Sequence, residues 1–160
     1  MNPTPENPAA PELPSSAMAR RLRVGDSATF TKTVGEYDVY GFAGITGDFA
    51  PNHIDRAYME AGSYGERIAH GVLILGLSST ASTQIAARSG DRAVSYGYDR
   101  VRFVAPVFLG DTVTITYTVD RIDDDEQKSY ASVVATDQRG QTCMVATHIM
   151  KFLPQPDDAS

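Results

Sequence analysis

An aspartate and a histidine that could act together on one water molecule lie in a short polar segment of the chain. Asp48 precedes His53 by five residues within residues 46–55, which read Thr-Gly-Asp-Phe-Ala-Pro-Asn-His-Ile-Asp. Gly47 and Pro51 are expected to keep this segment from forming a regular helix, so that both side chains lie on a bent loop. A carboxylate and an imidazole that reach the same water can take one proton from it and return one elsewhere. Adding or removing water across a carbon–carbon bond requires this chemistry.

The same pair also has a purely structural interpretation. Asp48 could cap the end of a helix, because aspartate side chains often accept hydrogen bonds from nearby backbone N–H groups. His53 could be a partly buried histidine whose ring nitrogens are satisfied by neighbouring groups. The sequence that surrounds the pair decides between the two interpretations.

Helices are expected on both sides of the loop. Apolar residues in Glu36 to Ile45 recur at the spacing of a short amphipathic helix. Asp55 is expected to cap a second short helix that ends near Ala61. The longest helix is predicted from Val72 to Arg88. Its first part is apolar on every side, which predicts burial, and the small residues of its second part would allow a sheet to wrap closely around it.

Strand patterns make up most of the remaining sequence. After the long helix, apolar residues recur at every second position, which is typical of strands. Turn residues such as those at 123–126 and 138–140 separate the strand segments. The predicted strands are Ser27 to Val34, Ala93 to Phe103, Thr112 to Ile122, Tyr130 to Thr136 and Thr142 to Phe152. One buried helix against one curved antiparallel sheet is an α+β arrangement.

Composition and charge limit the other possibilities. The chain has 160 residues, 42% of them hydrophobic, which suits a single compact domain. Its net charge of −6 argues against nucleic acid or a membrane surface as a main partner.

We expect residues 1–20 to be a disordered leader, residues 21–154 the domain and residues 155–160 a short tail. With one cysteine, Cys143, no disulfide within the chain can form, and a cytoplasmic location is expected. No cluster has the ligand spacing of a metal site, so no metal or other cofactor is predicted.

Three separated motifs resemble one known family. They are Gly-Asp-Phe-Ala-Pro-Asn-His at residues 47–53, Ile-Ala-His-Gly at residues 68–71, and the run from Arg100 to Asp111 that contains Phe-Val-Ala-Pro-Val-Phe-Leu-Gly-Asp. Their order and spacing resemble the MaoC-like (R)-specific enoyl-CoA hydratases and 3-hydroxyacyl-CoA dehydratases, over roughly residues 22–153. The resemblance implies a hot-dog fold, in which an antiparallel sheet wraps a long central helix. It also implies a homodimer.

The resemblance also implies roles for individual residues. Asp48 and His53 match the family positions that hold the catalytic water, and Gly71 matches the position whose backbone N–H faces the thioester carbonyl of the acyl-CoA substrate. A helix N-terminus supplies N–H donors with a favourable dipole, although Gly71 could instead simply permit a tight entry into the helix. Ser79 aligns with a serine that lines the family's active site, but it lies about 12 Å further along the helix. His70 is expected to orient the loop.

The sequence departs from the family at one point in the first motif. The family has Asn where this chain has Ala50, and an amide appears two positions later, at Asn52. We expect Asn52 not to replace the missing group, because it should point elsewhere on the loop. His148, in the last predicted strand, has no visible partner and is expected to be structural.

Other activities of the same fold remain alternatives to the lyase reaction. A hot-dog thioesterase would hydrolyse the acyl thioester, but such enzymes generally carry their acidic residue on the central helix, where this sequence has neither Asp nor Glu. A non-catalytic subunit that binds an acyl thioester would not need both Asp48 and His53. Dehydratases that act on acyl carrier protein differ from the leading hypothesis only in the carrier.

Overall fold

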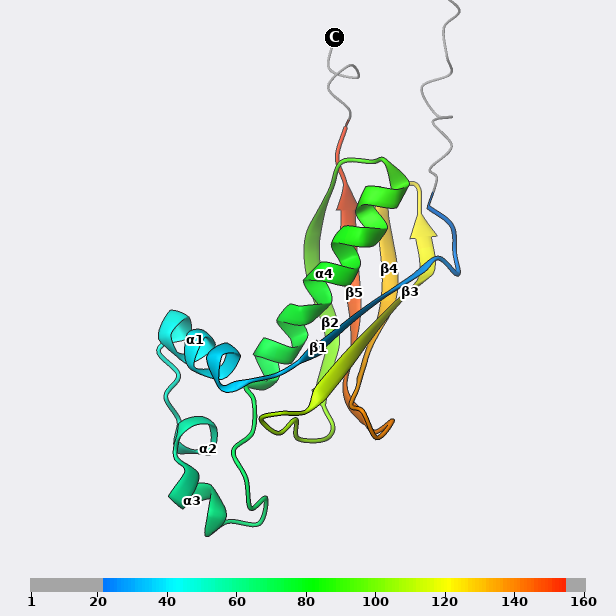
Figure 1. Cartoon of the computed structure of the whole chain (residues 1–160). Helices are drawn as coiled ribbons and strands as arrows, with labels where there is room; N and C mark the ends of the chain where they lie inside the picture. The colour runs from blue at the N-terminus through cyan, green and yellow to red at the C-terminus, as the bar shows by residue number, and fades with distance from the viewer. Residues whose placement is uncertain (1–21, 155–160) are drawn as a thin grey trace, which may run out of the picture.

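The sheet has five antiparallel strands. The computed structural model describes residues 22–154, so the predicted leader and tail lie outside the described part of the chain. The strands are β1 (Ser27–Thr33), β2 (Ala93–Phe103), β3 (Thr112–Asp123), β4 (Lys128–Thr136) and β5 (Thr142–Phe152), in the order β1-β3-β4-β5-β2. Figure 1 shows the sheet curving around one long helix, α4 (Gly71–Ser89). The predicted α+β hot-dog architecture is therefore confirmed, with strand bounds within a few residues of those expected.

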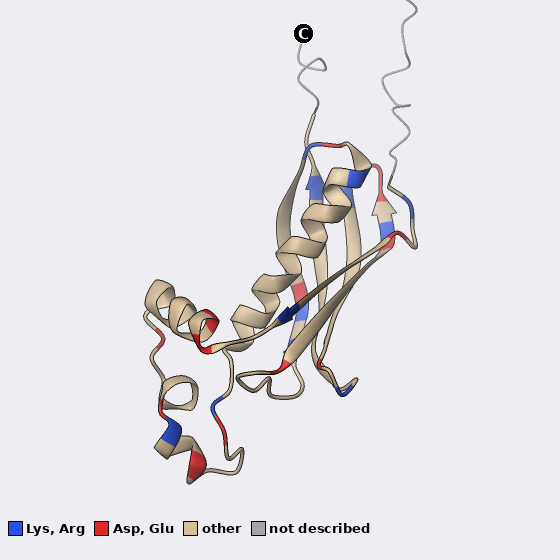
Figure 2. Cartoon of the chain, in the orientation of Figure 1, with Lys and Arg blue, Asp and Glu red and all other residues tan. Residues whose placement is uncertain are grey.

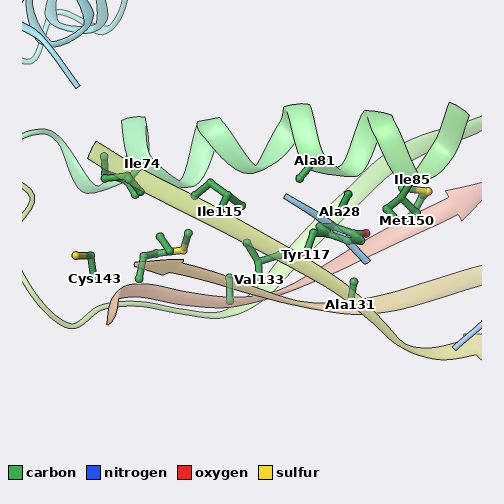
Figure 3. Close-up of a cluster of buried hydrophobic side chains, with 14 of the residues drawn as sticks. Ala28, Ile74, Ala81, Ile85, Ile115, Tyr117, Ala131, Val133, Cys143 and Met150 are labelled. Atoms are coloured by element: carbon green, nitrogen blue, oxygen red, sulfur yellow. The ribbon is translucent and has the colours of Figure 1, made fainter. Parts of the chain in front are cut away.

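The core lies between α4 and the inner face of the sheet. Ile74, Ala81 and Ile85 point from α4 towards Ile115 and Tyr117 on β3 (Figure 3). On β3 as far as Val119, and along all of β4, buried residues alternate with half-buried ones, because every second side chain of a strand points to the same face. Burial of this continuous apolar layer is the main stabilising contribution to the fold.

Burial of α4 is only partial, contrary to the prediction for its first turns. The buried positions of α4, such as Ile74 and Ser78, lie on the face towards the sheet. Val72, two residues before Ile74 and therefore on the other side of the helix, keeps 57% of its surface exposed in the single chain. The sheet covers one side of α4 only, so apolar residues on the other side remain uncovered.

Strand β2 forms one edge of the sheet and is irregular. Its pairing with β5 shifts register between Ser95 and Gly97 and again between Asp99 and Arg102. Arg100, inside the second shift, has a φ of 54°, in the left-handed region that non-glycine residues seldom adopt. Beyond this bulge the strand ends at Phe103, which begins the wall of the candidate site.

Three short helices precede α4 and lie beyond one end of the sheet (Figure 1). Helix α1 (Glu36–Thr46) ends at Gly47, which adopts a left-handed conformation with a φ of 80°. Helix α3 (Arg56–Glu60) starts after Asp55, whose side chain accepts a hydrogen bond from the backbone N–H of Tyr58, as predicted. No helix in the described part of the chain combines the length and apolar character that a bilayer crossing requires.

Helix α2 (Pro51–Ile54) was not expected. Pro51 was predicted to prevent regular helix around His53, whereas it occupies the first turn of a single-turn helix. Proline is tolerated there because the first N–H groups of a helix have no intrahelical partner. His53 therefore projects from a helical turn and not from an irregular loop.

His148 on β5 is buried in the core with both ring nitrogens bonded. Its Nδ1 lies 2.8 Å from the Tyr117 hydroxyl, and its Nε2 lies 2.8 Å from Ser95 Oγ. The Tyr98 ring packs against the imidazole with centroids 4.6 Å apart. These contacts agree with the structural role expected for His148. Its partners were not visible in the sequence because they lie on β2 and β3, far from His148 along the chain.

Burial lowers the pKa of His148 to about 4, well below that of a histidine in an unfolded chain. Between pH 6.5 and 4 the unfolded chain therefore binds a proton that the folded chain does not, so the free energy of unfolding should fall on acidification, by up to about 3 kcal/mol. We expect a His148→Gln variant to show a flatter dependence in urea unfolding measured across this pH range. Equal slopes for the two proteins would contradict this assignment.

Candidate active site

The imidazole of His53 is fixed in one tautomer. His53 is 8% exposed, and its Nδ1 lies 2.7 Å from the carbonyl oxygen of Ile68. A carbonyl oxygen only accepts hydrogen bonds, so Nδ1 must carry a proton, and in the neutral imidazole Nε2 then carries the lone pair. His53 thus presents an unprotonated nitrogen on the side of the ring that faces away from Ile68.

Asn52 contacts this unprotonated nitrogen, which corrects the expectation that it points elsewhere. Its side-chain Nδ2 lies 3.2 Å from His53 Nε2. The sequence could not show this contact, because the direction of the Asn52 side chain depends on the unexpected helical turn of α2. The backbone of Asn52 is also held, since its carbonyl oxygen accepts a 3.0 Å hydrogen bond from the N–H of Ile68.

Ile68 is itself held by the loop that follows β2. It forms an isolated antiparallel bridge with Phe108, and the N–H of Ala69 donates to the carbonyl oxygen of Val107 at 2.8 Å. These pairs join the segment before α4 to residues 104–111. The motif match singled out both segments, but neither the pairing nor the role of Ile68 as the acceptor for His53 could be read from sequence.

Asp111 anchors residues 104–111 in turn. Its buried carboxylate accepts hydrogen bonds from the Phe108 N–H at 2.9 Å and from the Gln138 side chain at 2.6 Å, and it pairs with Arg139 at 3.1 Å. Burial alone would raise the pKa of Asp111, but these donors outweigh it and hold the pKa below its usual value. The Gly-Asp pair that ends the third motif therefore supports the site from outside and does not belong to its chemistry.

His70 lies directly against His53, one member of the pair of Asp48 and His53, called the dyad below. Its ring stacks on that of His53 with centroids 3.7 Å apart, and its Nε2 donates to the backbone carbonyl oxygen of Asp48 at 3.0 Å. Among the described residues, its buried Nδ1 has no hydrogen-bond partner. These contacts join the loop of Asp48 to the start of α4, as expected of a residue that orients the loop.

Asp48 is the exposed member of the group. Its side chain is 53% exposed, and its Oδ1 accepts a 3.2 Å hydrogen bond from the N–H of Ala50. The structural interpretation is thus partly correct, because Asp48 does hold the turn that leads into α2. One carboxylate oxygen can bond to a backbone N–H while the other remains available to water.

Asp48, His53 and His70 bring their polar atoms within 4.8 Å of one another. That separation would allow one small ion or one water to contact all three. However, His70 Nε2 donates a hydrogen bond to the backbone carbonyl oxygen of Asp48, and a nitrogen that carries a proton cannot also coordinate a metal. The geometry therefore fits a water shared by Asp48 and His53 better than a metal ion.

A cavity of about 300 Å³ opens beside His53. Most of its lining residues have apolar side chains, and Asn52 and His53 add polar groups, which is a usual combination in a small-molecule site. It is lined by Asn52, His53, Tyr64, Ile68, Ala69, Gly71, Ile74, Phe103, Val104, Ala105, Pro106, Val107, Cys143 and Met144. The cavity thus brings together two of the residues singled out from sequence, His53 and Gly71, with Asp48 adjacent to His53.

Gly71 is the first residue of α4 and lines this cavity. Within residues 22–154, its backbone N–H has no hydrogen-bond partner, as is usual for the first turn of a helix. A side chain at this position would not fit, since a Cβ atom would lie 2.8 Å from ring carbons of Phe103. Both sequence-based roles of Gly71, a free donor and a tight approach, are therefore compatible with the structure.

Ser79 is not brought to the cavity. It lies on the exposed side of α4 and does not line the cavity wall, whereas its neighbour Ser78 is buried and lies 2.9 Å from the Tyr98 hydroxyl. Along the helix, one residue of difference turns a side chain by about 100°, from the sheet side to the open side.

Comparisons with known proteins identify relatives of this chain. The family model for the MaoC like domain matches residues 17–145. An (R)-specific enoyl-CoA hydratase of Rhodospirillum rubrum is 39% identical over 99 residues, which cover 61% of this chain and 66% of that protein. The 3-hydroxyacyl-thioester dehydratase Z of Mycobacterium tuberculosis is 31% identical over 142 residues, covering 86% of this chain and 93% of that protein.

The solved structures show the same likeness in three dimensions. An (R)-hydratase from A. caviae that is involved in PHA biosynthesis superposes with a TM-score of 0.77 at 29% identity, over 85% of this chain and all of that one. An R-hydratase from Pseudomonas aeruginosa, in its unliganded form, gives a TM-score of 0.73 at 29% identity over 84% of each chain. From the family match, the relatives and the shared fold, we conclude that this chain belongs to the MaoC-like domain family of hydratases and dehydratases.

Proposed function

We propose that this protein is an (R)-specific enoyl-CoA hydratase, which also runs in reverse as a 3-hydroxyacyl-CoA dehydratase. The observation that carries the proposal is the single cavity that holds the unprotonated Nε2 of His53 and the free N–H of Gly71, with Asp48 beside it. A proton acceptor and an oxyanion donor that face one cavity are the groups that hydration of an unsaturated thioester needs. The names of the relatives support the same substrate class.

In the hydration direction, a water between Asp48 and His53 attacks C3 of a trans-2-enoyl thioester. The oxygen forms a bond to C3, the π electrons move towards the thioester carbonyl, and one member of the dyad accepts a proton from the water. Negative charge on the thioester oxygen is stabilised by the N–H of Gly71, at the positive end of the α4 dipole. A proton then reaches C2 on the same face, which completes the (R)-3-hydroxyacyl thioester.

Two alternatives make different predictions from the same site. Hot-dog thioesterases generally carry an acidic residue on the central helix, whereas α4 contains neither Asp nor Glu, and the acidic positions in Figure 2 lie outside it. A non-catalytic subunit would not need the ordered contacts that hold His53. Release of free CoA thiol from an enoyl-CoA would favour the first alternative, and absence of any turnover would favour the second.

We also propose that the protein works as a homodimer. The side of α4 that carries Val72 is open in the single chain, and strand β2 leaves one edge of the sheet unpaired. Val94 and Tyr96 on this edge are exposed apolar residues. A second copy against these surfaces would cover apolar area that a single chain leaves in water.

Replacement of either dyad residue tests the proposed reaction. We expect Asp48→Asn and His53→Gln each to lower kcat for hydration of crotonyl-CoA by roughly 100- to 10,000-fold, because each removes a proton-transfer group. The double variant should lose little more than the worse single one, since the two groups act on one water. Loss of the ultraviolet absorbance of the enoyl thioester gives the rate, and Asp55→Asn, which keeps a capping side chain on the same loop, is the matched control.

Gly71→Ala tests the close approach of Phe103 to the start of α4. The added Cβ would clash with the Phe103 ring, so we expect a loss of about 1–3 kcal/mol in the free energy of unfolding, measured with urea. If the clash is the cause, the cost of Gly71→Ala should be smaller in a Phe103→Leu background. Purely additive effects of the two changes would show that the ring moves aside freely.

A further inference from the structure

Asn52 is placed to act on the proton acceptor of the site. It is the only residue between positions 46 and 55 with an amide side chain, it lines the cavity, and its Nδ2 lies 3.2 Å from His53 Nε2. Since His53 donates through Nδ1 to Ile68, Nε2 can only accept, and the Asn52 amide must be the donor. The identity of the amide nitrogen in this contact therefore follows from the tautomer of the histidine.

The backbone holds Asn52 and His53 as one unit. The Ile68 N–H donates to the carbonyl oxygen of Asn52 at 3.0 Å, and the Ile68 carbonyl oxygen accepts from His53 Nδ1 at 2.7 Å. One residue thus fixes both the main chain of Asn52 and the ring of His53. With the backbone of Asn52 held, only the two torsions of its side chain must be ordered to make a directed contact, so little conformational entropy is lost.

We propose that Asn52 is a positioning residue for the catalytic water, an inference that rests on the proposed function. The Nε2 atom has one lone pair, which cannot accept protons from both Asn52 and a water. When bound substrate holds a water between Asp48 and His53, the Asn52 N–H moves from Nε2, its partner in the substrate-free protein, to the water oxygen. The water then donates one hydrogen to each member of the dyad and accepts one from Asn52, which leaves its second lone pair directed at C3.

This role compensates for Ala50. At that position the resembling family carries Asn, whereas Ala50 contributes only its backbone N–H, which donates to Asp48 Oδ1 at 3.2 Å. The amide that this chain does contain stands two residues later and reaches the dyad from the side of His53. A neutral donor of this kind orients a water without adding a charge to the cavity.

Kinetics of two near-isosteric variants measure the effect. We expect Asn52→Leu to lower kcat for crotonyl-CoA hydration roughly 3- to 10-fold with little change in KM, because a neutral hydrogen bond to the water is lost and the acyl contacts remain. Asn52→Asp should lose more than 10-fold, since a carboxylate can only accept and would retain a proton on His53 Nε2. Asp55→Asn should leave kcat within twofold of the parent. Unchanged kcat in Asn52→Leu would overturn the proposal.

Nuclear magnetic resonance tests the contact independently of turnover. The chain has three histidines, so a long-range proton–nitrogen spectrum contains three imidazoles, assigned by removing each in turn. The Nε2 signal of His53 should be that of a hydrogen-bonded acceptor in the parent. Its chemical shift should move towards that of an unbonded acceptor nitrogen in Asn52→Leu and towards that of a protonated nitrogen in Asn52→Asp. It should not change in Asp55→Asn. If the signal is unchanged in both Asn52 variants, the inference is wrong whether or not the protein is a hydratase. If the shifts occur in an inactive protein, the contact between Asn52 and His53 is confirmed, and the proposed function is wrong together with the water-positioning role that rests on it.

Discussion

The hydrogen bond from His53 Nδ1 to the carbonyl oxygen of Ile68 determines what the candidate site can do. At 2.7 Å it fixes the proton on Nδ1, and this leaves Nε2 as an acceptor. Without it the imidazole could adopt the other tautomer, in which the nitrogen near Asn52 and the cavity would be a donor and could not take a proton from water. The stacked ring of His70 blocks one face of the imidazole, so rotation of the ring is restricted as well.

The position of the Ile68 carbonyl depends on structure well outside the cavity. Ile68 pairs with Phe108, and the Phe108 N–H donates to the buried carboxylate of Asp111. Asp111 is held by Gln138 and Arg139 in the turn between β4 and β5. A run of polar contacts thus connects the turn between β4 and β5 to His53, through the side chain of Asp111 and the backbone groups of Phe108 and Ile68. This explains why the third motif matters for a reaction whose groups it does not supply.

The sequence predicted most of the fold and only part of the site. Period-two alternation in the strands and the Asp55 cap are local signals, and the strands and helix α3 form where these signals place them. Helix α2 was missed because Pro51 can either break a helix or begin one, and only the tertiary setting decides. That error carried over to Asn52, since its direction depends on the helical turn. The exposed side of α4 at Val72 was missed for another reason: hydrophobicity shows that a surface should be covered but not by which chain.

The two members of the dyad are held to different degrees, and this difference suggests how the site would be completed. His53 is buried and bonded on both ring nitrogens, whereas Asp48 is half exposed and held through one carboxylate oxygen. A carboxylate that faces bulk water interacts weakly with any one water molecule, because many others compete for it and the dielectric constant is high. Hydration by the proposed mechanism therefore needs the substrate, or a second chain, to cover Asp48 before its pairing with His53 becomes effective. The pre-formed half of the site is the histidine, and the half that binding must complete is the aspartate.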